Sequence, residues 1–196
     1  MARLSRILAC AFLASTAALA ADPVRILIAY HSRTGNTEKI AAAVRDGAAS
    51  ITGVEVALRK VADVTAGDIV KSDGIILGTP VEWGNLSAES KGFLDRVGAV
   101  LGKAGPTLGE GRTAAVFCTA GSPSNGQELA RMSAIAALLA MRFVIVGGVN
   151  EDGFGTLGAQ AATAGKPPGI NDRDRADARR LGERFARITL QFRAAR

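Results

Sequence analysis

Three short polar segments of the sequence contain residues that could bind a ligand. The first runs from His31 to Thr37 and surrounds a glycine with hydroxyl and amide side chains, between an apolar run and a helical pattern. Backbone N–H groups and the positive dipole end of a helix start attract a phosphate dianion. The glycine and lysine patterns of triphosphatases and dinucleotide folds are absent. This favours a monophosphate held by Ser32, Arg33, Thr34, Gly35, Asn36 and Thr37. The alternative is a turn whose hydroxyls only cap the helix.

The second segment contains the single Trp of the chain, Trp83. It comprises Pro80, Val81, Glu82, Trp83, Gly84 and Asn85, and it follows an apolar run that ends at Gly78. An aromatic ring on a loop can stack on a flat ligand, and a nearby glycine lets the backbone approach the ring edge. The alternative is that Trp83 packs beneath the loop as an ordinary buried side chain.

The third segment is again small and polar, and comprises Thr119, Ala120, Gly121 and Ser122. All three segments follow apolar runs that are typical of buried parallel strands. The carboxyl ends of parallel strands lie at one edge of the sheet, where ligands of open α/β sheets bind. We therefore expect the three segments to form one site.

The elements that position these segments alternate between strand and helix patterns. Strands are expected at 24–30, 54–58, 74–78, 113–118 and 143–146, and helices at 38–51, 86–101, 127–139 and 172–192 with a helical turn at 68–70. Residues 150–170 carry many Gly and two adjacent Pro and indicate an extended loop. Strands joined by helical crossovers predict a three-layer, doubly wound α/β fold with a five-stranded parallel sheet.

The N-terminus has the pattern of a secretory signal peptide. Arg3 and Arg6 precede an apolar stretch that ends in small residues, with expected cleavage near Ala20-Ala21. We therefore expect residues 1–20 to be a signal peptide, residues 24–196 to be one domain, and the protein to be exported, in the periplasm, with no membrane span after cleavage. The alternative is an uncleaved N-terminal anchor. Loss of Arg3 and Arg6 leaves 22 Lys and Arg against 18 Asp and Glu.

Other reactive residues are few. Cleavage would leave one cysteine, Cys118, in a buried strand, where we expect an inert thiol. His31 is the single His, so no Cys-His or Ser-His-Asp set and no metal cluster is expected. His31 could act as a pH-dependent cation beside the first segment or be a solvated neighbour of it. Basic residues after Arg173 alternate with acids, which favours a solvated helix face over a nucleic-acid site.

Two stretches resemble a known family. Residues 26–37 resemble the first strand and FMN phosphate loop of flavodoxins, and residues 72–98 are similar to flavodoxin-like NAD(P)H:quinone oxidoreductases of the tryptophan repressor-binding protein type. The resemblance extends over residues 24–192, through Gly126-Gln127-Glu128 and Phe154-Gly155. It implies a flavodoxin-like fold with strand order 2-1-3-4-5 and a dimer or tetramer.

The resemblance also implies roles for the three segments. Ser32–Thr37 would hold the FMN phosphate, Pro80–Asn85 would border the isoalloxazine, and Thr119–Ser122 would line its pyrimidine side. NAD(P)H would be the electron donor and a small-molecule quinone the acceptor. The flavin carries the chemistry, so no catalytic side chain is assigned.

The sequence departs from that family at several positions. Glu82 stands where the family usually has Arg, and a carboxylate there disfavours negative charge on the flavin and lowers its potential. The family's Trp after the third helix and His of the fourth helix correspond to aliphatic residues, near Val100 or Leu101 and at Leu138 or Leu139. Two alternatives therefore stay open beside a quinone reductase: an electron carrier that docks a redox partner protein, and a flavin-free interaction module.

Overall fold

Five parallel strands in the order β2-β1-β3-β5-β6 form the central sheet in the computed structural model. The structure describes residues 22–105, 107, 109–123, 125–148, 156–164 and 169–195. The strands are β1 (Val24–Tyr30), β2 (Val54–Lys60), β3 (Gly74–Glu82), β4 (Asn85–Leu86), β5 (Thr113–Ala120), β6 (Val144–Ile145) and β7 (Gln160–Ala162). Because β5 and β6 are the fourth and fifth of the expected strands, the predicted order 2-1-3-4-5 is confirmed.

The helices are α1 (Asn36–Ala49), α2 (Ala66–Lys71), α3 (Ala88–Ala104), α4 (Gln127–Ala140) and α5 (Asp172–Ala194), with a 3₁₀ turn η1 (Val61–Asp63). Each corresponds to a predicted helix or turn, apart from η1. The sequence allows either Asn171 or Asp172 as the cap of α5, and the structure has Asn171. Its side chain accepts a hydrogen bond from the Asp174 N–H, while the Asp174 carboxylate accepts one from the Asn171 N–H. This is a reciprocal capping box.

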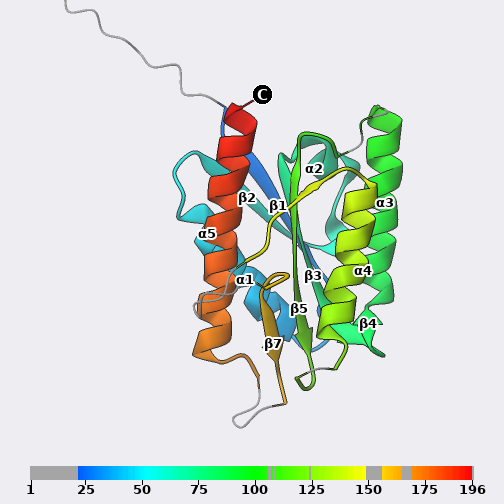
Figure 1. Cartoon of the computed structure of the whole chain (residues 1–196), viewed down its shortest axis with the longest axis vertical. Coiled ribbons are helices and arrows are strands. Elements are labelled where there is room, and N and C mark those ends of the chain that lie inside the picture. Colours follow the sequence, from blue (N-terminus) through cyan, green and yellow to red (C-terminus); the bar gives the residue numbers. More distant parts are fainter. Residues whose placement is uncertain are drawn as a thin grey trace, which may run out of the picture.

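The helices cover both faces of the sheet, as Figure 1 shows, with α1 and α5 on one side and α3 and α4 on the other. Side chains of β1 alternate between the two cores. Ile26, Ile28 and Tyr30 pack with α1 and α5, whereas Leu27 and Ala29 pack with α3 and α4. This period of two explains why β1 is apolar from Ile26 to Ala29, since both faces of that stretch are buried.

The fifth strand is split into two pieces, β6 and β7. One side of β5 pairs with β3, over residues 113–119 of β5. The other side of β5 pairs with β6 at Thr113 and Ala114, and with β7 from Cys118 to Ala120. The prediction of an extended loop is therefore wrong for residues 160–162. Their sequence, Gln-Ala-Ala, contains no β-branched or aromatic residue, and pairing with β5 imposes the extended conformation.

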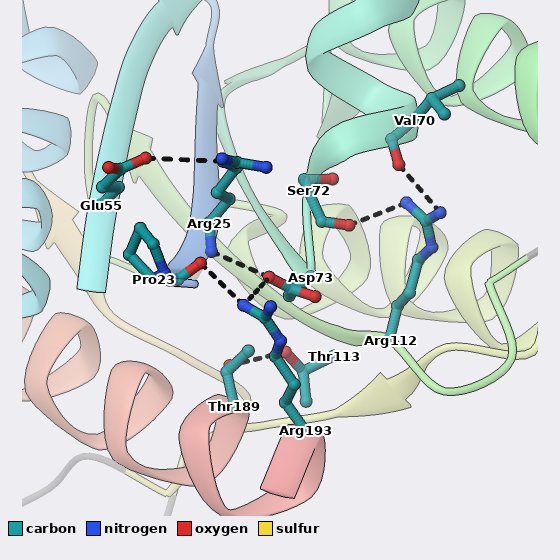
Figure 2. Close-up of polar contacts among 10 residues, drawn as sticks. All are labelled: Pro23, Arg25, Glu55, Val70, Ser72, Asp73, Arg112, Thr113, Thr189 and Arg193. Carbon is teal, nitrogen blue, oxygen red and sulfur yellow. Dashed lines mark hydrogen bonds and ion pairs between the residues drawn. The ribbon is translucent and has the colours of Figure 1, made fainter. Parts of the chain in front are cut away.

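The amino-terminal edge of the sheet is joined to α5 by polar contacts, shown in Figure 2. Arg193 donates hydrogen bonds to the Pro23 carbonyl at 2.7 Å and to Asp73 Oδ2 at 3.2 Å, and the Arg25 N–H donates to the same carboxylate oxygen at 2.9 Å. Thr113 and Thr189 share a buried hydroxyl contact of 2.7 Å. These contacts hold the last turns of α5 against the starts of the strands.

The expected signal peptide and its cleavage site lie outside the described residues. None of the helices within the described ranges is long and apolar enough to cross a membrane.

Candidate functional site

The first segment connects β1 to α1 and presents the start of that helix. Gly35 caps α1 in the left-handed conformation, with φ of 81°, and α1 begins at Asn36. The first N–H groups of a helix have no intrahelical acceptor, so those of Asn36 and Thr37 can bind an anion. Ser32 Oγ accepts a long hydrogen bond from the Glu38 N–H at 3.4 Å, and the His31 N–H donates to the Gly78 carbonyl at 3.0 Å. The loop is thus tied to β3 and open at the helix start.

The Thr37 side chain links the first segment to β5. Its hydroxyl is buried and contacts the Thr119 hydroxyl at 2.8 Å. This contact joins the first segment to the end of β5, so the Thr37 side chain faces the interior. The hydroxyls of Ser32 and Thr34 are not buried in this way, and Thr34 Oγ1 accepts a hydrogen bond from the Asn36 side chain at 3.3 Å. Of the hydroxyls in this segment, the Ser32 hydroxyl therefore does cap the start of α1, by accepting from the Glu38 N–H, although the N-cap residue itself is Gly35.

The second segment is a β-hairpin, which corrects the prediction of a loop. β3 continues to Glu82, and β4 pairs with it antiparallel, Val81 opposite Leu86 and Glu82 opposite Asn85. Trp83 and Gly84 form the two-residue turn with φ of 49° and 82°. Positive φ at both positions identifies a type I′ turn, which normally carries Asn-Gly rather than Trp-Gly. The hairpin was missed because its turn lacks that signal.

The Trp83 side chain projects into solvent. Its relative exposure is 105%, so the alternative of a Trp packed beneath the loop is wrong. A bulky residue with positive φ and no packing contact is costly in two ways, through backbone strain and through exposed apolar surface. Such a residue is expected where a ligand or partner uses it.

The third segment begins inside β5. Thr119 and Ala120 are the buried last residues of that strand, and Gly121 and Ser122 are the exposed residues that follow. A methyl group on Gly126, just before α4, would lie 2.3 Å from the Gly84 carbonyl oxygen. The backbone of the second segment therefore closely approaches the start of α4, four residues beyond the end of the third segment.

Charged side chains also join the segments. Arg33 Nη1 lies 3.4 Å from Glu82 Oε1, linking the first segment to the hairpin. This contact partly offsets the Glu82 carboxylate, although it is exposed and weak. The sequence did not predict that Glu89, in the first turn of α3, lies 3.6 Å from His31 Nε2. No local sequence pattern could have predicted this contact, because His31 and Glu89 are 58 positions apart in the sequence.

Cys118 and Tyr30 lie close to the site but are not reactive groups. Burial raises the pKa of the Cys118 thiol to about 12, so the thiol stays neutral, as predicted for an inert residue. Burial, followed by the hydrogen bond to Glu38 at 2.7 Å, raises the pKa of Tyr30 to about 12. Leu138 is buried in the core and Leu139 is exposed, so neither supplies a polar group.

The arrangement suits one class of ligand. An open helix start can bind a phosphate, and an exposed indole at the same edge of the sheet can contact a flat ring. A methyl group on Gly35 or Gly84 would meet nothing within 4 Å, so there is open space in front of both turns. A phosphate monoester joined to a planar ring fits these features, and FMN has both parts.

Comparisons with known proteins agree with this reading of the fold. A family model described as NADPH-dependent FMN reductase matches residues 65–155. A protein of Aquifex aeolicus (strain VF5) named flavodoxin is 35% identical, over 86% of this chain and 88% of its own. A protein of Paracoccus denitrificans (strain Pd 1222) named NAD(P)H dehydrogenase (quinone) is 30% identical, over 74% of this chain and 77% of its own.

Solved structures give the same fold. The structure described as a flavodoxin, WrbA-like protein from Agrobacterium tumefaciens matches with a TM-score of 0.68 and 19% identity, over 86% of this chain and 99% of that one. An archaeal flavodoxin matches with a TM-score of 0.66. Together with the sequence relatives, these matches show that the chain belongs to the flavodoxin-like family of FMN-dependent NAD(P)H:quinone oxidoreductases.

Proposed function

We propose that this protein is an FMN-binding oxidoreductase that oxidises NAD(P)H and reduces quinones by two electrons. The observation that carries the proposal is the meeting of an open helix start with the exposed Trp83 hairpin at one edge of the sheet. The relatives named NAD(P)H dehydrogenase (quinone) and the matching FMN reductase model support the donor and the acceptor.

Each segment has a defined part in this proposal. Ser32–Thr37 bind the FMN phosphate through the N–H groups at the start of α1, and Thr37 holds the loop to β5 by its contact with Thr119. When FMN is bound, Pro80–Asn85 would border the isoalloxazine, Trp83 would supply an aromatic ring to contact it, and Thr119–Ser122 would line the pyrimidine side. The isoalloxazine supplies the two-electron chemistry when it is bound. Arg33 reduces the negative potential that Glu82 places beside the ring.

A flavin-binding measurement tests the site separately from turnover. The purified chain should bind FMN at least ~100-fold more tightly than riboflavin, since two charge-assisted hydrogen bonds to the phosphate contribute about 1.5–3 kcal/mol each. Trp83 is the single Trp, so quenching of the tryptophan fluorescence reports contact of the ring with this side chain. Equal affinity for FMN and riboflavin would rule out the phosphate loop.

Turnover distinguishes the enzyme from the electron carrier. The FMN-loaded protein should oxidise NADH or NADPH in the presence of benzoquinone. If it binds FMN but oxidises neither nicotinamide, it is a carrier that docks a redox partner protein, a function suggested by the Aquifex relative's name. If it binds no FMN, it is an interaction module.

Export to the periplasm is part of the proposal and has its own test. The basic N-terminus followed by an apolar stretch supports a cleaved signal peptide. Sequencing the protein from a periplasmic fraction should find Ala21 as the first residue. An intact N-terminus in the cytoplasmic fraction would refute export. Dimer or tetramer formation, also proposed, is checked by light scattering of the purified protein.

A further inference from the structure

We propose that His31, Glu82 and Glu89 bind one divalent transition-metal ion, with Zn²⁺ as the reference ion. The three residues lie on different elements, namely the loop after β1, the end of β3 and the first turn of α3. One potential ligand atom of each lies within 4.8 Å of the others. His31 Nε2 and Glu89 Oε2 are 3.6 Å apart, close to the ~3.4 Å between two ligand atoms at a tetrahedral zinc with bonds of ~2.1 Å.

The Nε2 atom of His31 is the second observation that points to a ligand. It is buried and has no hydrogen-bond partner among the described residues. A buried nitrogen without a partner is unfavourable, so such an atom is expected to have one in the working protein. The Glu89 oxygen is beyond the ~3.2 Å limit of a normal N–H···O bond. A metal ion between the two would bond both atoms at once.

The chemistry of the three side chains selects the kind of ion. One imidazole and two carboxylates suit zinc and its neighbours in the first transition row, whereas magnesium and calcium prefer oxygen alone. Two carboxylate charges balance a divalent cation. Three protein ligands leave the fourth tetrahedral position for water or a small anion.

The backbone already holds the ligands in place. The His31 N–H donates to the Gly78 carbonyl at 3.0 Å, and Glu82 is paired with Asn85 in the hairpin. Glu89 follows the Ser87 cap of α3, whose side chain accepts a hydrogen bond from the Ser90 N–H at 3.2 Å. Ligands on short, hydrogen-bonded segments lose little conformational entropy when they bind an ion.

A metal ion bound by Glu82 must compete with the positively charged side chain that already contacts this carboxylate. Arg33 lies 3.4 Å from Glu82 Oε1, but its side chain is 71% exposed, so releasing it costs little. Lys60 and Arg96 line a cavity of about 550 Å³ that His31 and Glu89 also border.

A zinc titration tests the proposal without flavin. The full chain, prepared without a polyhistidine tag and treated with a chelator, is titrated with Zn²⁺ in a calorimeter, and one ion per chain is expected. Because His31 is the single His, its ring protons give one identifiable set of NMR signals. Those signals should shift with the first equivalent of zinc.

Variants identify the ligands. His31→Gln and Glu89→Gln should each weaken zinc binding at least ~10-fold, since even outer-shell changes at metal sites cost about that much. Glu128→Gln is the matched control, because Glu128 is the second residue of α4 as Glu89 is of α3, and both are about half exposed or more. Circular dichroism checks that each variant is folded.

Three results would overturn the proposal. These are the absence of stoichiometric binding at millimolar zinc, binding that leaves the His31 signals unshifted, and equal affinities for the wild type, His31→Gln and Glu89→Gln. None of these measurements involves FMN or turnover, so their failure is independent of the proposed quinone reductase activity.

Discussion

Trp83 is the residue at which local preference and observed conformation disagree most. Its φ of 49° is unfavourable for a bulky side chain, and a residue in such a region costs about 1–3 kcal/mol. Its ring is exposed, so packing within the chain does not offset that cost. This uncompensated cost supports the ligand-binding role proposed above for Trp83.

Replacement of Trp83 separates stability from binding. Trp83→Asn creates the Asn-Gly pair that type I′ turns prefer, so we expect the free energy of unfolding in urea to rise by about 1 kcal/mol. FMN affinity, followed by flavin fluorescence, should fall because the stacked ring is lost. A variant that is less stable, or that keeps the wild-type FMN affinity, would contradict this assignment.

Tyr30 provides a pH measurement at a single residue. It is the one Tyr of the chain, so absorbance near 295 nm reports its ionisation alone. Burial and then Glu38 raise its pKa from 10.0 to about 12. A raised folded pKa means that its contribution to stability is complete below pH 10 and is lost as the pH rises from 10 towards 12. Glu38→Gln should lower the titration midpoint, whereas a wild-type midpoint at 10 would contradict the raised pKa.

At the scale of elements, α1 and α5 pack with their backbones in close approach. A methyl group on Gly182 of α5 would lie 2.0 Å from the Val44 carbonyl oxygen, and one on Gly47 of α1 would lie 2.0 Å from the Arg179 carbonyl oxygen. These two glycines let the helices meet closely on one face of the sheet (Figure 1). Both helices border the core that contains β1, the strand that precedes the proposed phosphate loop.

Two Gly→Ala substitutions in helices should have opposite effects. Gly182→Ala should lower the free energy of unfolding by about 2–3 kcal/mol, because overpacking forces the helices apart. Gly92→Ala in α3 is the control, since its methyl group would meet nothing within 4 Å. It should raise stability by about 0.5–1 kcal/mol through helix propensity. Urea denaturation of both variants checks the pair, and equal effects would contradict the close approach.

For the whole molecule, the amino-terminal and carboxyl-terminal edges of the sheet differ in how far polar contacts close them. The amino edge is closed by the Arg193, Asp73 and Arg25 contacts of Figure 2, whereas the carboxyl edge presents the open helix start and the exposed hairpin. Contacts at the amino edge should therefore affect stability without affecting ligand binding.

Asp73→Asn tests this division. It removes the charge that Arg193 contacts at 3.2 Å, and we expect the free energy of unfolding to fall by about 1–2 kcal/mol, near the value of a hydrogen bond to a charged group. FMN affinity should stay within about twofold of the wild type, because both edges are separated by the length of the strands. A large loss of FMN affinity in a folded variant would show that the edges are coupled.

The elements with strong local signals were predictable. The apolar run of β1, the helical spacing of α4 and the Asn171 cap of α5 each depend on neighbours along the chain, so their patterns indicate structure directly. β7 and the hairpin were not predictable. Gln160–Ala162 has no strand preference of its own, and Trp83-Gly84 does not resemble a usual hairpin turn.

The same division applies to the candidate site. The sequence alone determined the three segments and their common edge, because segments that follow parallel strands must lie at one end of the sheet. Only the tertiary structure decided how the side chains meet there. It turned Thr37 inward to Thr119, exposed Trp83, and brought His31 to Glu82 and Glu89. Contacts between residues distant in sequence depend on how strands and helices pack, and no local pattern contains that information.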